Sequence, residues 1–183
     1  MATSLAQVAG FLDNRGWRYH LDTEGDRIIT GVESEQVENF TIVIQLQEDG
    51  EYLAFIAPQL LYLKDHVYKG VAFQTMLAIA WEVQLLRWEY DPSDGEVRTS
   101  TGIALEDATL TEKQFNRLLS GLIQLTNDGV ERLKGVLATG NDPGGKTITA
   151  QMIAALREML SDEGLAELQA ELQQLESEGN SSS

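Results

Sequence analysis

The amino-acid sequence predicts an α+β fold, an antiparallel sheet with helices packed on it, followed by a C-terminal helical appendage. The expected order is helix, four strands, helix, two strands, helix. Short turns rich in Gly, Asp and Glu separate most of the expected strands, and strands joined by such turns pair antiparallel. The strands come in runs and do not alternate one by one with helices, which excludes a wound parallel sheet.

The first run of elements is a helix and four strands. The apolar residues Leu5, Val8 and Leu12 recur at helical spacing, and Ser4 can cap this helix. Strands with turns between them are expected at residues 17–21, 27–32, 40–47 and 52–57. Pro58 is expected to end the fourth strand, because proline has no N–H to donate to a ladder.

The second run begins with a helix that is apolar around nearly its whole circumference, over residues 71–86. Such a helix must be covered on several sides, by a sheet and, as an open alternative for the remaining sides, by a second subunit. Two strands follow, at residues 87–90 and 96–105, joined by a turn rich in Asp and Gly.

A long helix closes the second run. Thr109 followed by Glu112 predicts a capping box at its start. Its apolar stripe consists of Phe115, Leu118, Leu119, Leu122, Leu125, Val130, Leu133 and Leu137. Gly129 is expected to be a weak point, since glycine lowers helix stability.

The character of the chain changes after the long helix. We expect an α+β domain at residues 1–138, a Gly/Pro linker at 139–147, an acidic helical tail at 148–178 and a disordered end at 179–183. In the tail, Leu165, Leu168, Leu172 and Leu175 follow heptad spacing for under two heptads, too short to predict a coiled coil. Docking on its own domain and gripping a partner are both open to such a segment.

Composition excludes several classes of function. The 183 residues have a net charge of −16 and a pI of about 4.3. Nucleic acids and anionic membranes bind proteins through Lys and Arg, so neither is an expected partner. The chain has no cysteine, which excludes disulfides and thiolate metal sites. With no secretory signal and no uncharged run long enough to span a bilayer, a cytoplasmic protein is expected.

The segment TGNDPGGKT at residues 139–147 matches the P-loop pattern G-x-x-x-x-G-K-[ST]. A working P-loop follows a buried parallel strand and leads into a helix whose N-terminus receives the phosphates. Here the preceding residues are predicted to be helical, and no strand is predicted downstream. The match is therefore interpreted as a Gly-Pro linker, with a nucleotide-binding enzyme kept as the alternative.

No metal, cofactor or catalytic site is predicted. Asp22 and Glu33 have the spacing of the first and twelfth positions of a calcium loop, but Arg27 stands where that loop requires glycine. The flanking residues alternate like strands, so a hairpin tip is favoured. His20 and His66 have neither metal-ligand spacing nor a nucleophile beside them.

A connection that is expected to be polar is instead apolar. It contains Leu61, Tyr62, Leu63, Val67 and Tyr68, between Pro58 and the central helix. One interpretation is a short buried helix that covers the sheet edge. The other is an exposed patch that binds a partner protein or a second copy of the chain.

Three stretches carry a family resemblance: the opening helix running into Gly16 and Trp17, Ala80-Trp81-Glu82 leading into residues 87–91, and the strand at 99–105 followed by 107–115. In this order of elements the chain resembles the YbjN family, which is similar in fold to type III secretion chaperones. The resemblance covers roughly residues 4 to 137. The extra strand pairing near the N-terminus and the tail after Gly140 depart from the family pattern.

The resemblance implies an α+β domain with a curved antiparallel sheet, often dimeric, that acts by binding other proteins. The family consists of proposed regulators and chaperone-like proteins, and it brings no catalytic residues. We therefore expect a cytoplasmic, non-enzymatic, homodimeric protein-binding module, chaperone-like or regulatory. The acidic surface biases it toward basic partners.

Overall fold

The computed structural model describes residues 3–33, 39–106 and 108–144, and it confirms the predicted α+β fold and element order. The elements are α1 (Leu5–Asn14), β1 (Tyr19–Asp22), β2 (Arg27–Val32), β3 (Phe40–Gln47), the 3-10 turn η1 (Glu48–Gly50), β4 (Tyr52–Tyr62), α2 (Lys69–Glu82), β5 (Arg87–Tyr90), β6 (Glu96–Ala104) and α3 (Glu112–Thr139). They belong to one compact unit, Met1–Pro143.

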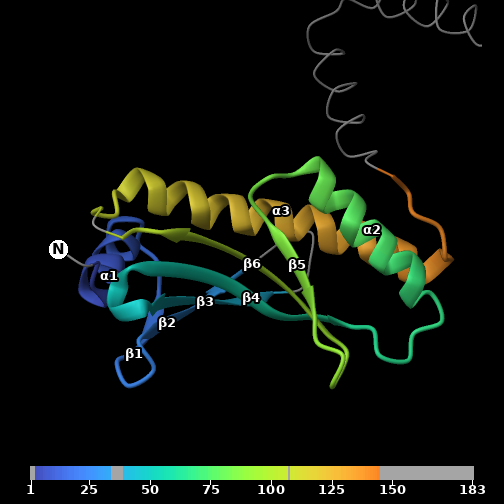
Figure 1. The fold of residues 1–183 in the computed structure, drawn as a ribbon, viewed down its shortest axis with the longest axis horizontal. Helices are drawn as coiled ribbons and strands as arrows, with labels where there is room; N and C mark the ends of the chain where they lie inside the picture. The colour runs from blue at the N-terminus through green and yellow to red at the C-terminus, as the bar shows by residue number, and fades with distance from the viewer. Residues whose placement is uncertain (1–2, 34–38, 107, 145–183) are drawn as a thin grey trace, which may run out of the picture. The chain divides into compact units, whose positions relative to one another are not determined.

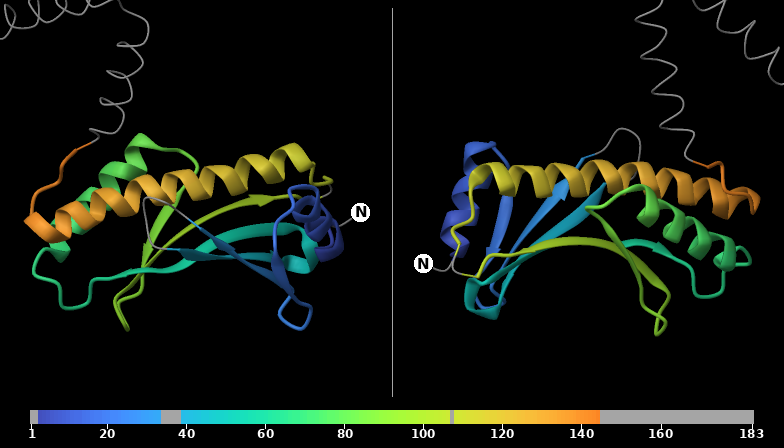
Figure 2. Two further views of the ribbon diagram at one scale, coloured as in Figure 1. Left: turned by 180° about the vertical axis from the view of Figure 1, so that it is seen from behind. Right: turned by 45° about the horizontal axis from the view of Figure 1, so that its top comes forward.

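The six strands form one open, curved sheet in the order β1-β2-β3-β4-β6-β5 (Figure 1). Every pair of neighbouring strands is antiparallel, as the short turns predict. The three helices lie on the same side of the sheet (Figure 2). The long helix α3 runs along the sheet, with α1 near its first turns and α2 beside its last turns.

The larger part of the core lies between α1, α3 and the strands β2 to β4. Alternate residues of each strand face the helices, so Ile28, Ile42 and Phe55 are all completely buried. Three rings join the elements, since Phe115 of α3 lies 5.4 Å from Phe11 of α1 and 5.5 Å from Phe55 of β4. These rings fix the first half of α3 on the sheet.

A second, smaller cluster lies under α2. It consists of Leu63, Ala72, Met76, Val97, Leu133 and Val136, all buried. Trp88 of β5 packs against both clusters. The described residues therefore form two neighbouring cores, and α3 contributes to each of them.

The prediction that Pro58 ends the fourth strand was wrong. Strand β4 continues to Tyr62, and its register with β6 shifts between Ala57 and Leu61. Gln59 adopts a left-handed backbone, with φ of 57°, and its N–H donates to Glu96 Oε1 at 2.9 Å. A bulge accommodates the missing N–H of proline, so the strand bends and does not stop.

Two helix boundaries also differ from the prediction. Helix α2 ends at Glu82, four residues before the expected end, because Val83 is extended. Helix α3 is capped by Thr111, whose side chain accepts from the Gln114 N–H in a full capping box. The predicted box at Thr109 was therefore wrong, since the same pattern two residues later is used.

The chain turns back after α3. Gly140, with φ of 76°, is the left-handed C-cap of the helix and packs against the Tyr68 ring. Pro143 then lies beside Gly135, one turn before the helix end. The tail predicted at 148–178 and the end predicted at 179–183 lie outside the described residues.

Candidate protein-binding surface

The outer face of α2 is exposed and apolar. Leu77 is 72% exposed and Trp81 is 91% exposed, the two most exposed large apolar side chains of any described helix. They are four residues apart, so they lie on the same face of the helix, one turn from each other. No charged residue occurs between Lys69 and Glu82, in a chain whose net charge is −16. We call the pair Leu77 and Trp81 the α2 face.

The opposite side of α2 explains why this face is uncovered. Ala72, Thr75, Met76 and Ile79 are buried against α3 and the sheet. Four inward residues suffice to dock a helix of this length, and the remaining apolar residues must point elsewhere. In the part of the chain that the structure describes, α3 and the sheet therefore cover α2 on one side only, and not on the several sides that the sequence predicts.

An ionic clamp fixes the C-terminal end of α2. Arg132 of α3, with a side chain only 9% exposed, donates to Glu82 at 2.9 Å and to both carboxylate oxygens of Asp142 at 2.8 Å. Asp142, and after it Glu82, hold the pKa of Arg132 above its ordinary value, against the effect of burial. The Arg132 guanidinium, about two turns before the end of α3, thus joins the end of α2 to the returning chain.

The five apolar residues predicted between Pro58 and the central helix do not form one patch. Leu63 is completely buried in the second core, and Leu61 packs against the same cluster. Tyr62, at the end of β4, and Val67, in the following turn, are 56% and 82% exposed. Tyr68 is half-buried and precedes α2. The short buried helix proposed for this segment was wrong, because Leu61 and Tyr62 belong to β4.

Leu165, Leu168, Leu172 and Leu175, the other predicted partner-binding residues, lie outside the described residues. Neither Leu77 nor Trp81 was predicted as a partner-binding residue, although Trp81 is among the residues that carry the family resemblance. A helix that is apolar all round gives no periodic stripe from which an outer face could be chosen.

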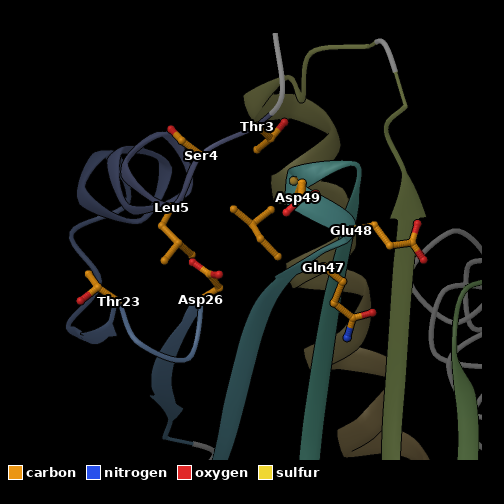
Figure 3. Close-up of a pocket in the computed structure, with 10 residues that line it drawn as sticks. Thr3, Ser4, Leu5, Thr23, Asp26, Gln47, Glu48 and Asp49 are labelled. Carbon is orange, nitrogen blue, oxygen red and sulfur yellow. The ribbon is translucent and has the colours of Figure 1, made fainter.

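A pocket of about 540 Å³ lies at the other end of the sheet (Figure 3). It is lined by Thr3, Ser4, Leu5, Thr23, Asp26, Leu46, Gln47, Glu48, Asp49 and Gly50. Glu48 points away from Asp26 and Asp49, so the three carboxylates do not converge on one point. Among the described residues no group of His, Asp and Glu has the geometry to hold a metal ion.

The segments that matched ligand-binding motifs have other roles in the described residues. Asp22, the first residue of the calcium-loop-like segment, pairs with Arg27 at 2.8 Å, and this contact lowers the pKa of the Asp22 carboxyl. The P-loop-like segment follows α3, which is a helix and not a strand. His20 is exposed on β1, and the His66 Nδ1 accepts from the Tyr68 N–H.

The sheet face opposite the helices is a second open surface (Figure 2). Ile29, Val43 and Ile56 form a row across three neighbouring strands, and all three are half-buried. Glu89 and Arg98, on the neighbouring strands β5 and β6, form an ion pair at 2.6 Å. The row exposes much less apolar surface than the α2 face does.

No helix of the described part is long and apolar enough to cross a bilayer.

Comparison with known proteins relates this arrangement of elements to a solved structure. No protein-family model matches the chain, and no curated protein matches its sequence. The crystal structure of YbjN, a proposed transcription regulator from E. coli, superposes with a TM-score of 0.57 at 11% identity. Its fold is similar to that of this chain.

The likeness to YbjN covers 94% of YbjN but 74% of this chain, which therefore has residues beyond the shared fold. At this identity the likeness to YbjN shows the fold alone.

Chains of two complexes are also similar to this chain. A chain of the HopA1–SchA chaperone–effector complex matches with a TM-score of 0.47 at 14% identity, over 67% of this chain and 88% of that chain. A chain of the ExsC–ExsE complex matches with a TM-score of 0.48 at 20% identity, over 68% of this chain and 92% of that chain. With TM-scores below 0.5, these two likenesses are too loose to support an inference.

Proposed function

We propose that this protein is a non-enzymatic, cytoplasmic protein-binding module, chaperone-like or regulatory, that engages its partners through the α2 face. The observation that carries the proposal is the exposure of Leu77 and Trp81 on an uncharged helix surface. Exposed large apolar residues that cluster in this way are typical of surfaces that bind other proteins.

Trp81 is suited to anchor such a contact. Tryptophan is enriched among the residues that dominate binding energies at protein interfaces, and its truncation often weakens binding by about 2 kcal/mol or more. The rest of the surface also favours contact at this face. Elsewhere on a molecule with net charge −16, an acidic partner is repelled and a neutral partner must remove water from charged groups. Leu77 and Trp81 carry no charge, so these two costs do not arise from them.

A second copy of the chain is one expected partner. Two copies that each carry a net charge of −16 repel each other, and the repulsion is least where their uncharged faces meet. In a two-fold pairing, Trp81 of one copy would lie against Leu77 of the other, which buries both exposed side chains. We therefore propose a homodimer formed through the α2 face, which other protein partners can also occupy.

The test replaces both exposed residues in the full chain, as Leu77→Ser with Trp81→Ser. Crosslinked co-purification from the native host should lose its protein partners. Sedimentation should show dimer dissociation at concentrations at least about 1,000-fold higher than for the parent chain, because each of the two copies loses a Trp81 side chain at a cost of about 2 kcal/mol. The matched control is Gln74→Ser, an exposed residue on the same helix that contributes no apolar area. Unchanged partners and unchanged sedimentation in the double variant would refute the proposal.

The alternative function is a nucleotide-binding enzyme that uses residues 140–147. Its test is calorimetry with ATP and GTP in the presence of magnesium, on the parent chain and on Lys146→Ala. Saturable binding that the substitution removes would establish this alternative. The helix that precedes the segment leads us to expect no heat of binding.

A further inference from the structure

We propose that Arg132 of α3 is a positioning residue for the α2 face, because it holds the last turn of α2 and, with that turn, the side chain of Trp81. This inference rests on the proposed function, since it states what the α2 face needs in order to bind a partner. It also makes a claim about the free chain, that the end of α2 depends on one residue of another helix. That claim can be tested without any partner.

The last turn of α2 is weakly fixed by its own residues. Val83 follows the helix with an extended backbone, and its N–H donates to the Ile79 carbonyl at 3.0 Å. Helix α3, in contrast, ends in the left-handed Gly140, a cap that favours a firm helix end. Of the last four residues of α2, only Ile79 is buried. Neither capping nor packing therefore prevents this turn from fraying.

The charge at this end of α2 also acts against the helix. The C-terminus of a helix carries a partial negative charge, which cations stabilise and anions destabilise. The last turn of α2 contains no basic residue, and its final residue is the acidic Glu82. The Nη1 atom of Arg132 lies 2.9 Å from the Oε2 atom of Glu82. Helix α3 thus supplies the cation that the end of α2 lacks.

Arg132 is itself held in one orientation. Its side chain is only 9% exposed, and its Nε and Nη2 atoms each lie 2.8 Å from an oxygen of Asp142. This paired contact fixes the plane of the guanidinium group and directs Nη1 toward Glu82. A lysine has no such planar fork, so it cannot make both contacts in this way.

The last turn matters for binding because Trp81 belongs to it. The Trp81 side chain is 91% exposed, so the backbone of the turn, and not side-chain packing, determines where the ring lies. A partner that meets a frayed turn must first order it, and ordering side chains at an interface lowers affinity. We expect loss of the Arg132 contacts to weaken binding at the α2 face by about tenfold for each copy affected.

Amide hydrogen exchange in the full chain tests the claim about the free chain. Arg132→Met removes the charge but keeps an unbranched apolar side chain. It is compared with Arg132 in a chain that carries Leu77→Ser and Trp81→Ser, so that association does not protect the helix. The Val83 amide should exchange about tenfold faster in the variant, because the last turn opens more often. The Ala72 amide, in the first turn of α2, should keep its rate.

Two matched variants are the controls for exchange. Arg98→Met removes another contact between a guanidinium and a carboxylate, at 2.6 Å, and should leave the Val83 rate unchanged. Arg132→Lys keeps the cation beside the end of α2 and should restore the Val83 rate to within about threefold of that with Arg132. Unchanged exchange of Val83 in Arg132→Met would overturn the inference. Equal acceleration at Ala72 would also overturn it, because the whole helix would then be destabilised.

Sedimentation of Arg132→Met, with Leu77 and Trp81 intact, tests the consequence for binding. Dimer dissociation should occur at concentrations about 100-fold higher than for the parent chain, because both copies lose the contacts of Arg132. Unchanged dissociation together with faster exchange of Val83 would overturn the positioning role. The proposed function is decided separately, by the Leu77 and Trp81 double variant. If that variant keeps its partners, the proposed function fails, whereas the exchange rates still show whether Arg132 holds the turn.

Discussion

A missing side chain at Gly129 lets Trp88 pack between the two cores. A Cβ atom built at Gly129 would overlap the Trp88 ring, which comes from the neighbouring strand β5 and contacts both core clusters. The sequence suggested that Gly129 weakens α3, and local helix propensity supports that view. The contact with Trp88 could not be foreseen, because it joins residues that are distant in the chain. Here tertiary packing outweighs the local preference.

The same substitution at two helical glycines tests this packing. Gly129→Ala should destabilise the protein by about 1 to 2 kcal/mol, because the overpacking of Trp88 exceeds the gain in helix propensity. Gly10→Ala in α1, where nothing lies within 4 Å, should stabilise it by about 0.5 to 1 kcal/mol. Urea unfolding followed by circular dichroism measures both. Equal stabilisation by the two substitutions would mean that the Trp88 ring is not seated on Gly129.

At the scale of elements, the sequence predicted most strands to within two residues, since they depend on local alternation and on turn residues. The strand β4 is the exception. Pro58 argued for a strand end, but the bulge at Gln59 and the Glu96 carboxylate that accepts its N–H carry the strand on to Tyr62. A compensation that depends on a carboxylate from another strand leaves no local trace. The apolar residues after Pro58 were for that reason assigned to a connection.

The start of α3 gives a matched pair of cap variants. Thr111→Ala should lower the free energy of unfolding by about 1 kcal/mol, since the Thr111 hydroxyl accepts from the Gln114 N–H at 3.2 Å. Thr109→Ala should change it by less than about 0.5 kcal/mol, because Thr109 is exposed and precedes the cap. The difference is measured from the urea concentrations at the midpoints of unfolding, with the dependence of the unfolding free energy on urea held equal for the two variants. A larger effect at Thr109 would restore the capping box that the sequence suggested.

At the scale of the whole molecule, charge and exposure act together. The net charge of −16 predicted an absence of basic surfaces, but it could not show where charge is missing from the folded surface. That location depends on which side of α2 packs inward, and four buried residues of α2 decide it. The candidate site therefore could not be predicted beyond the statement that the helix needs cover. Its two exposed residues follow from the packing of α2 on α3.

The excess of negative charge makes the stability of the protein depend on salt. Raising NaCl from about 20 mM to about 500 mM shortens the screening length from roughly 20 Å to roughly 4 Å and weakens the repulsion between carboxylates. We expect the melting temperature to rise by about 3 °C, which corresponds to roughly 1 kcal/mol for a chain of this size. Choline chloride should act equally if screening is the cause. A falling melting temperature would mean that ion pairs such as Arg132–Asp142 outweigh the repulsion.

Helix α3 serves both cores, and this restricts how its length can change during evolution. Phe115 and Leu122 belong to the first cluster, while Leu133 and Val136 belong to the second. One residue added between them would rotate the second half of the helix by about 100° and turn Leu133 away from its cluster. Steps of about seven or about eleven residues, which lie close to whole numbers of turns, restore the direction in which Leu133 faces. We therefore expect the insertions and deletions that are tolerated in evolution to lie at the ends of α3 or in the turns between strands.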